Sequence, residues 1–395
     1  MNQELGSLFE ITSSKRVFQS EWKEKGIPFL RAREVVQLSK TGQLKNEISI
    51  SEEMYSEYAK KFGVPQIGDI LVTGVGTLGI TYLVKDKRKF YFKDGNIIWL
   101  KKKSEKVYSE YVEYAFKSSL IRNQIERSAN GATVGTFTIT NAKQVQILLP
   151  PLPIQQKIAE VLDTADRIRR RNQQILDKYD QLAQSVFLEM FGDISENKKF
   201  NITRVGDMVK MVKDGPHVSP KYSEDKDAIP ILSTRNIRPF ELVLDEVKYV
   251  SRNTFKELTS RFRPQKGDVL LTKGGTTGYA KIVDFDWDFC IWVHLAALRP
   301  DLDKVHPKYL EGALNSHYCY YQSQRFTRGI ANRDLGLTRM INIQLPNPPL
   351  NLQNQFASII EKIEQQKQHA KAELDKSEEL FGSLLQKAFN GGLFK

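Results

Sequence analysis

The stretch GDILVTGVGTLGITYLV, residues 68–84, decides how this chain is built. An apolar run leads to Gly74, Gly76 and Gly79, and a β-branched and aromatic run follows them. The G-x-G-x-x-G spacing is associated with a dinucleotide pyrophosphate only where a strand precedes it and a helix follows it in a βαβ unit. Because a second strand follows here, the stretch predicts a glycine-rich β-hairpin, with a nucleotide site as the alternative.

The same pattern returns as GDVLLTKGGTTGYAKIV at residues 267–283, an interval of about 200 residues that is too long for a solenoid repeat. Lys273 stands where the first copy has Gly74, so the glycine motif is broken while the strand-turn-strand pattern persists. The glycines are therefore interpreted as turn residues with positive φ and as points of close backbone approach. IPFLRAREV from Ile27 likewise matches IPILSTRNI from Ile229, which indicates a duplicated domain.

Each copy ends in a long periodic segment that follows a proline-rich joint, LLPPLP before Ile154 and LPNPPLN before Leu352. Apolar residues at alternating steps of four and three predict a coiled-coil seam, which the second helix keeps only with a four-residue stutter. The single polar member of the first seam either fixes the register or faces solvent. The predicted seam residues are Ile158, Val161, Ile168, Asn172, Ile175 and Leu182 in the first helix, and Phe356, Ile359, Ile363, Leu374 and Leu384 in the second.

These patterns predict an α+β fold with a pseudo-two-fold internal repeat. Two mixed α/β domains are expected at residues 1–150 and 194–346. A pair of long antiparallel coiled-coil helices, at residues 151–193 and 347–395, is expected to separate them at a set distance.

The chain of 395 residues carries a net charge of +12, and its excess of Lys and Arg lies in residues 1–150 and 194–346. This distribution favours a polyanionic partner that touches two sites, with a merely basic surface as the alternative. The absence of a membrane-spanning apolar stretch and of a signal-peptide pattern predicts a cytoplasmic protein without a membrane partner. Cys290 and Cys319 form neither a disulfide framework nor a zinc motif.

No catalytic constellation emerges from the sequence. The five histidines show no metal-ligand spacing, and no phosphate-binding G-x-x-x-x-G-K-[ST] motif is present, so neither a metal nor a cofactor is expected. NPPL at residues 347–350 resembles the motif with which amino methyltransferases hold a flipped adenine. Leu350 replaces the aromatic residue that would stack on the base, and no glycine-rich cofactor strand accompanies the motif.

The duplicated basic domain, the LPPLPIQQKIAEVLD joint and the final LLQKAFNGGLF closely resemble the specificity subunits of type I restriction-modification enzymes over essentially the whole chain. The resemblance implies two target-recognition domains, each of which reads one half of a split sequence in double-stranded DNA. It also implies that the helices form a spacer and dock two methyltransferase subunits, that nuclease-translocase subunits join later, and that S-adenosylmethionine, ATP and Mg²⁺ bind to these partners. The alternatives are a self-sufficient DNA adenine methyltransferase that uses NPPL and a coiled-coil scaffold that binds protein.

Polar and basic residues in the loops and strand ends that recur in both copies are the candidates for DNA contact. For Arg33 and Arg235, an internal salt bridge is the alternative. The candidates are Arg31, Arg33, Thr73, Thr77, Thr133 and Thr136 in the first copy, and Arg235, Asn236, Lys273, Thr276, Arg328 and Arg333 in the second.

Overall fold

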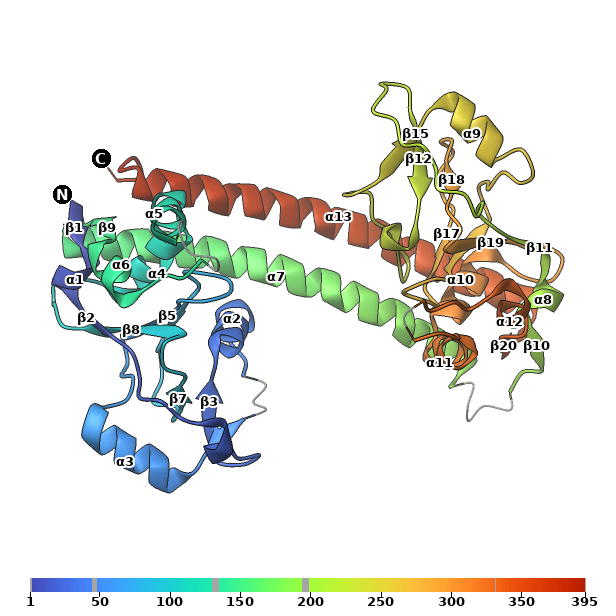
Figure 1. Ribbon diagram of the computed structural model, residues 1–395. Coiled ribbons are helices and arrows are strands. Elements are labelled where there is room, and N and C mark those ends of the chain that lie inside the picture. The colour runs from blue at the N-terminus through green and yellow to red at the C-terminus, as the bar shows by residue number, and fades with distance from the viewer. Residues whose placement is uncertain (1, 45–47, 130–134, 194–198, 331, 395) are drawn as a thin grey trace. The chain divides into compact units, whose positions relative to one another are not determined.

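The computed structural model describes residues 2–44, 48–129, 135–193, 199–330 and 332–394. The chain divides into two compact units, the first made of Met1–Gln173 with Ala372–Lys395 and the second of Gln174–Lys371. Two helices of 40 residues each, α7 (Leu152–Phe191) and α13 (Leu350–Phe389), contribute part of their length to each unit (Figure 1). Each unit therefore contains one copy of the duplicated domain and a section of both helices.

A four-stranded antiparallel sheet forms the centre of the first unit. Its strand order is β2 (Phe9–Thr12), β8 (Ile97–Lys102), β5 (Ile70–Thr73) and β6 (Thr81–Leu83). Ile70 and Val72 face a core under the helices, whereas Leu71 and Trp99 face a second core. Because side chains alternate along a strand and both faces of this sheet are covered, all four residues of β5 are buried.

Helices cover both faces of this sheet. One core contains residues of α4 (Ser109–Lys117), α5 (Ser119–Ala129) and the two long helices, and the other contains Val35 and Leu38 of α2 (Ala32–Thr41). A second sheet places β3 (Ile27–Leu30) antiparallel to β4 (Ser49–Ile50) and parallel to β7 (Tyr91–Phe92). The remaining elements are β1 (Asn2–Glu4), α1 (Leu5–Leu8), a 3₁₀ helix (Gln19–Glu21), α3 (Glu52–Phe62), α6 (Ile139–Gln144) and β9 (Gln146–Leu148).

The second unit repeats the topology of both sheets and adds a two-stranded pair, β13 (Ile237–Arg238) with β14 (Glu241–Leu242). Its four-stranded sheet has the order β11 (Val209–Asp214), β19 (Leu295–Pro300), β16 (Val269–Thr272) and β17 (Ala280–Ile282). In the second sheet, β12 (Ile229–Leu232) again has one antiparallel neighbour, β15 (Lys248–Val250), and one parallel neighbour, β18 (Cys290–Ile291). The other elements are β10 (Ile202–Arg204), α8 (Val205–Met208), α9 (Arg252–Leu258), α10 (Pro307–Asn315), α11 (His317–Phe326), α12 (Leu337–Met340) and β20 (Gln344–Pro346).

Buried side-chain hydrogen bonds repeat together with the strands. The Tyr111 hydroxyl donates to the Leu148 carbonyl at 2.6 Å, and in the second unit the Tyr309 hydroxyl donates to the Pro346 carbonyl at 2.8 Å. Both tyrosines are fully buried, and each ties the first helix after the main sheet to the strand before a long helix. The internal repeat predicted from the sequence therefore extends to individual polar contacts.

The two long helices run antiparallel within each unit. In the first unit, the Asn172 amide donates to the Glu373 carbonyl at 3.1 Å and to the Ser377 hydroxyl at 3.2 Å, while Arg169 lies over the Phe381 ring. Asn172 thus bonds to the opposite helix, as a residue that fixes the register would, while its side chain stays half-buried. In the second unit, Lys367 pairs with Asp180 at 2.5 Å.

The predicted seam is correct at some positions and wrong at others. Ile158, Phe356 and Leu374 are buried, and Val161, Asn172, Ile175, Ile363 and Leu384 are half-buried. Ile168, Leu182 and Ile359 are 46%, 44% and 39% exposed, so their assignment to the seam was wrong. An α-helix drifts by about 20° per heptad away from a strict seven-residue stripe, and the helix ends pack on the domain cores rather than on each other alone.

Within the described ranges, no helix is both long and apolar enough to span a membrane. The same part of the chain holds no group of three or more His, Cys, Asp or Glu side chains that would suit a metal ion. Cys290 and Cys319 are buried as free thiols.

Candidate nucleic-acid interface

The glycine-rich stretch of the first unit is a β-hairpin, as the sequence predicted, because β5 and β6 pair directly in antiparallel register. Gly76 and Gly79 have φ of 69° and 73°, the left-handed conformation that glycine adopts without strain. The Thr73 hydroxyl donates to the Thr77 carbonyl and accepts a hydrogen bond of 3.0 Å from the Ile80 amide. These bonds fix the conformation of the hairpin tip, at which Thr77 is exposed to solvent.

The hairpin of the second unit has the same construction. Gly275 and Gly278 have φ of 66° and 93°, and the hydroxyl of Thr272 accepts a hydrogen bond of 2.9 Å from the Tyr279 amide. Thr276 lies exposed at the tip. The repeated threonine at the end of the strand is therefore a structural residue, and the repeated threonine at the tip is the accessible one.

The prediction that Thr73 contacts DNA is consequently wrong. Its side chain is 0% exposed, and its hydroxyl is engaged by the hairpin backbone. Contact of the exposed Thr77 and Thr276 with DNA stays a prediction.

The loop that carries Arg328 and Arg333, the basic loop, lies against the tip of the second hairpin. The Gly275 amide donates to the Arg333 carbonyl at 3.0 Å, and Arg328 and Asp334 exchange two backbone hydrogen bonds of 2.9 Å. Arg328 and Arg333 are both exposed, and Arg333 also donates to the Gln324 side chain at 2.6 Å. The fold thus gathers three of the predicted contact residues, Thr276, Arg328 and Arg333, on one surface of the second unit.

The corresponding region of the first unit is described in part. The Phe137 backbone amide donates to the Gly74 carbonyl at 2.9 Å, so the chain at Phe137 lies beside the hairpin. Thr136 is half-buried and makes contacts of its own. Thr133 lies outside the described residues.

Lys273 does not belong to this exposed surface. Its residue is 6% exposed, and its ammonium lies 3.0 Å from Asp214 Oδ2. The prediction that Lys273 contacts DNA is therefore wrong, because its charge is neutralised inside the protein.

Two more of the predicted DNA-contact residues, Arg31 and Arg33, lie at the start of α2 in the first unit. Glu34 is 3% exposed and receives hydrogen bonds from Arg31 at 3.0 and 2.7 Å and from Arg33 at 2.6 Å. Burial alone would raise the pKa of Glu34, but the hydrogen bonds from both arginines lower it below its usual value. The internal salt bridge considered for Arg33 is present, although 57% of the Arg33 side chain remains exposed.

The matching segment of the second unit contains Arg235 and Asn236. Asn236 is 3% exposed, with its side-chain oxygen accepting from the Ser233 amide at 2.9 Å and its amide donating to the Val243 carbonyl at 3.0 Å. Asn236 is thus a structural residue, and its assignment as a DNA contact was wrong. Arg235 is 77% exposed and lies 3.8 Å from the exposed Glu246, a pairing that water screens strongly.

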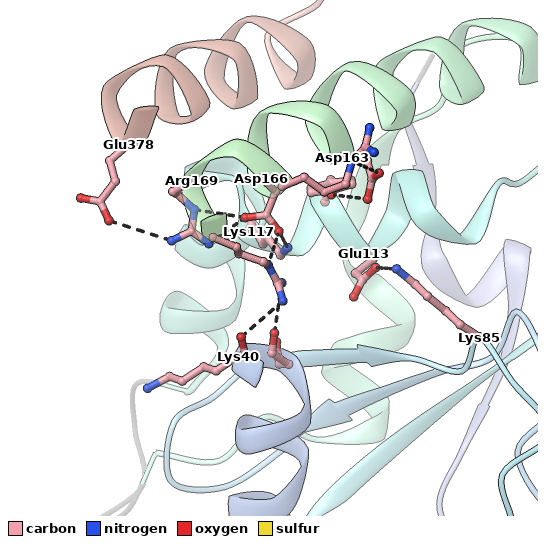
Figure 2. A network of polar contacts seen from close by, with 12 residues as sticks. Lys40, Lys85, Glu113, Lys117, Asp163, Asp166, Arg169 and Glu378 are labelled. Carbon is pink, nitrogen blue, oxygen red and sulfur yellow. Dashed lines mark hydrogen bonds and ion pairs between the residues drawn. The ribbon is translucent and has the colours of Figure 1, made fainter. Parts of the chain in front are cut away.

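A buried polar network that sequence reasoning missed connects α7 to the first domain (Figure 2). Asp166 of α7 is 4% exposed and accepts hydrogen bonds from Arg169 at 2.7 Å and Arg170 at 2.9 Å, with Lys117 of α4 at 3.7 Å. Burial alone would raise the pKa of Asp166, but the charge of Lys117 and the bonds from Arg169 lower it. The ion pairs therefore outweigh the cost of burying the carboxylate.

Arg170 extends this network to α2. Its guanidinium donates to the carbonyl oxygens of Ser39 and Lys40, both at 3.3 Å, in the last turn of that helix. A cation is favourable there because unpaired carbonyls and the helix dipole make the C-terminus negative. The helix whose first turn holds Arg33 is thus fixed at its other end by α7.

NPPL leads into α13, which begins at Leu350. The Pro348 carbonyl accepts a hydrogen bond of 2.9 Å from the Gln353 side chain. The backbone amide of Asn347 donates to the Asn201 backbone carbonyl at 2.8 Å. The motif therefore serves as a helix joint.

The sequence model of the family described as "Type I restriction modification DNA specificity domain" matches residues 1–178 and 197–376. The chain belongs to this family. Its relatives are named as specificity subunits of type I restriction enzymes. The family assignment removes the self-sufficient methyltransferase as an explanation of NPPL.

Three specificity subunits illustrate the relationship. A putative subunit from Haemophilus influenzae is 32% identical over 161 residues, which cover 40% of this chain and 38% of that protein. The putative MjaX subunit of Methanocaldococcus jannaschii is 22% identical over 376 residues, covering 86% and 83% of the two chains. The EcoBI subunit of Escherichia coli is 22% identical over 423 residues, covering 98% and 85%. The first of these matches thus spans well under half of the relative.

Solved structures share the fold. The crystal structure of the type I restriction-modification S subunit from M. genitalium aligns with a TM-score of 0.59 at 16% identity, covering 98% of this chain and 96% of that one. A chain from a study of complex assembly and conformational transition of the type I system gives a TM-score of 0.55 at 18% identity, covering 100% and 98%. The predicted α+β architecture with an internal repeat and two long helices is confirmed.

Proposed function

We propose that this chain gives a type I restriction-modification complex its DNA sequence specificity, with residues 1–150 and 194–346 each reading one half of a bipartite target. The observation that carries the proposal is the repetition of one surface. Each domain exposes a glycine-hairpin tip, which in the second domain lies beside the loop that carries Arg333, and these domains hold the positive charge of the chain.

The chemistry of the surface suits duplex DNA. Arg328 and Arg333 supply long cations that bind phosphate or the acceptor atoms of guanine in the major groove. The Thr276 hydroxyl beside them both donates and accepts hydrogen bonds, and it suits a base edge or a phosphate. In the first unit, Thr77 takes the role of Thr276, and the exposed part of Arg33 at the start of α2 supplies a cation.

The paired helices set the spacing of the two half-sites in this proposal, and they dock two methyltransferase subunits. Exposed apolar side chains support the docking role, since such residues on a helix favour a protein partner. They are Ile168 and Leu380 in the first unit, and Leu182, Leu188 and Ile359 in the second. Nuclease-translocase subunits join this complex in the cytoplasm, and S-adenosylmethionine, ATP and Mg²⁺ bind to the partners.

Domain exchange tests the reading of half-sites. Residues 1–150 are replaced by the equivalent domain of another family member, and methylated adenines are mapped in cells that express the complex. We expect one half of the methylated sequence to change while the other half and the spacing stay the same. A change in both halves would refute modular reading.

Substitution on the exposed helix surface tests the docking of methyltransferase subunits. Leu188→Glu places a charge on a side chain that is 49% exposed, and Gln181→Glu makes the same charge change at an exposed polar position of α7. We expect Leu188→Glu to weaken assembly by about tenfold and Gln181→Glu to leave it unchanged. Equal assembly of both variants would remove Leu188 from the interface.

The protein-scaffold alternative differs in its response to salt. The affinity of a DNA-reading complex falls steeply as salt rises, because phosphate contacts release counterions. The two functions are distinguished by measuring how tightly the wild-type complex binds a duplex that contains the mapped target. A shuffled duplex of equal composition is the reference. Equal affinity for both duplexes would favour the scaffold.

A further inference from the structure

Lys273 joins three segments of the second unit. Its ammonium lies 3.0 Å from Asp214 Oδ2 at the end of β11, 3.3 Å from the Val293 carbonyl before β19, and 3.4 Å from Asp334 Oδ1. Its side chain is 7% exposed. Two carboxylates around one buried cation satisfy its charge internally, so Lys273 is held in one position.

The segment at Asp334 is the end of the basic loop. Asp334 exchanges two backbone hydrogen bonds with Arg328, and its carboxylate also pairs with Arg339 at 3.2 Å. The Leu335 amide donates to the Lys273 carbonyl at 2.7 Å. Lys273 therefore holds the loop through both its main chain and its side chain, two residues before the exposed hairpin tip.

We propose that Lys273 is a positioning residue for DNA reading by the second unit. It fixes the loop that carries Arg328 and Arg333 beside Thr276, without touching DNA itself. The inference rests on the proposed function. Its physical basis is preorganisation, since a loop already held in its binding conformation loses less entropy when it meets DNA.

The first unit has no space for a side chain at the position equivalent to Lys273. Its equivalent residue is Gly74, where a Cβ atom would lie 2.8 Å from the Phe137 carbonyl oxygen. The backbone link survives there, because the Phe137 amide donates to the Gly74 carbonyl. Loss of Lys273 should consequently affect one half of the target and leave the other as an internal control.

The test uses the assembled complex and duplexes that carry the mapped target with single base changes in one half at a time. For Lys273→Met, we expect discrimination at the second half-site to fall about tenfold, and discrimination at the first to stay within about twofold. The slope of log affinity against log salt should not change, because no phosphate contact is removed. Arg333→Gln, by contrast, should reduce that slope by about one if Arg333 binds phosphate.

Lys281→Met is the matched control. Lys281 is another buried lysine of the same sheet, paired with Asp284 at 2.6 Å and lying 3.7 Å from Glu311. We expect this variant to lose stability and to keep its discrimination at both half-sites. Lys273→Arg should restore part of the discrimination. If Lys273→Met does not fold, Asp334→Asn tests the same link from a side chain that is 48% exposed.

Three results would overturn the inference. These are unchanged discrimination at the second half-site in both Lys273→Met and Asp334→Asn, a reduced salt slope in Lys273→Met, or the same loss of discrimination in Lys281→Met. Failure of the proposed function looks different, because the wild-type complex would then show no sequence preference at either half-site.

Discussion

Gln155 at the start of α7 and Gln353 at the start of α13 make the same set of hydrogen bonds in their respective units. Both side chains are fully buried. The Gln155 oxygen accepts from the Tyr108 amide at 2.9 Å, and its amide group donates to the carbonyls of Lys106 and Pro150 at 2.9 and 2.8 Å. Gln353 bonds in the same way to His306, Lys304 and Pro348. Each long helix is thereby pinned to its domain at the proline joint.

Removing either glutamine should destabilise its unit. Gln155→Leu or Gln353→Leu leaves backbone groups without partners in a buried site, so we expect a loss of about 3 kcal/mol in the free energy of unfolding. Urea denaturation of the full chain measures this loss. Gln156→Leu, at the exposed neighbouring position, should change stability by less than about 0.5 kcal/mol. Equal effects of Gln155→Leu and Gln156→Leu would contradict the assignment.

The two threonines of the first hairpin should respond differently to valine. Thr73→Val keeps the shape but removes the buried hydroxyl that bonds to Thr77 and Ile80, so we expect a loss of about 2 kcal/mol. Thr77→Val lies at the exposed tip and should leave the melting temperature unchanged while weakening recognition of the first half-site. Thermal denaturation combined with half-site binding assays separates the two effects. A stable Thr73→Val variant would refute the structural role.

Two glycines of the second hairpin allow the cost of backbone strain to be compared with the cost of a steric clash when a Cβ atom is added. Gly278 has φ of 93°, and an added Cβ would lie 2.1 Å from the Ser323 hydroxyl oxygen. Gly275 has φ of 66° with nothing near the added atom. We expect Gly275→Ala to cost about 1 kcal/mol from backbone strain, and Gly278→Ala to cost clearly more in the same denaturation experiment. The reverse order would be inconsistent with the packing of α11 on this hairpin.

The stabilising contribution of Asp166 should depend on pH. Because its pKa is lowered in the folded state, its contribution is present above the unfolded-state pKa of about 3.9 and is lost as pH falls through the folded-state value. We expect Asp166→Asn to cost about 2 kcal/mol at pH 7, since its arginine partners are partly exposed. The difference from wild type should shrink below pH 4.

Asp163→Asn is the control for that experiment. Asp163 lies on the same helix and pairs with Arg167 at 3.3 Å, but both side chains are more than half exposed. Its replacement should cost less than about 0.5 kcal/mol at pH 7. A difference between Asp166→Asn and wild type that stays constant down to pH 2 would argue against an ionised Asp166.

The hairpins and the duplication were predictable because they depend on local rules. Glycine positions with positive φ recur at Gly76 and Gly275, and strand residues flank them in both copies. The helix seam was less predictable because its partners change along the helix. Ile158 belongs to the core of the first unit, whereas Ile168 lies outside that core and is largely exposed.

The candidate site shows the limit of sequence reasoning most clearly at Lys273. The residue belongs to a glycine-rich loop, and such lysines commonly bind anions. Its actual partner, Asp214, lies 59 residues away in the chain, and no local pattern reports that contact. Nor does the sequence distinguish Thr73 from Thr77, because only the fold determines which of the two hydroxyl groups is buried.

The equivalent buried positions Glu34 and Asn236 have a consequence for inheritance. In one copy a carboxylate is matched to two arginines, and in the other an amide is matched to Ser233 and the Val243 carbonyl. A genetic crossover between positions 33 and 34 would separate the carboxylate from its arginines and strand a buried charge. Crossovers at the proline joints keep whole both these sets and long-range pairs such as Lys273 with Asp214, so new combinations of specificities arise most readily by trading complete domains.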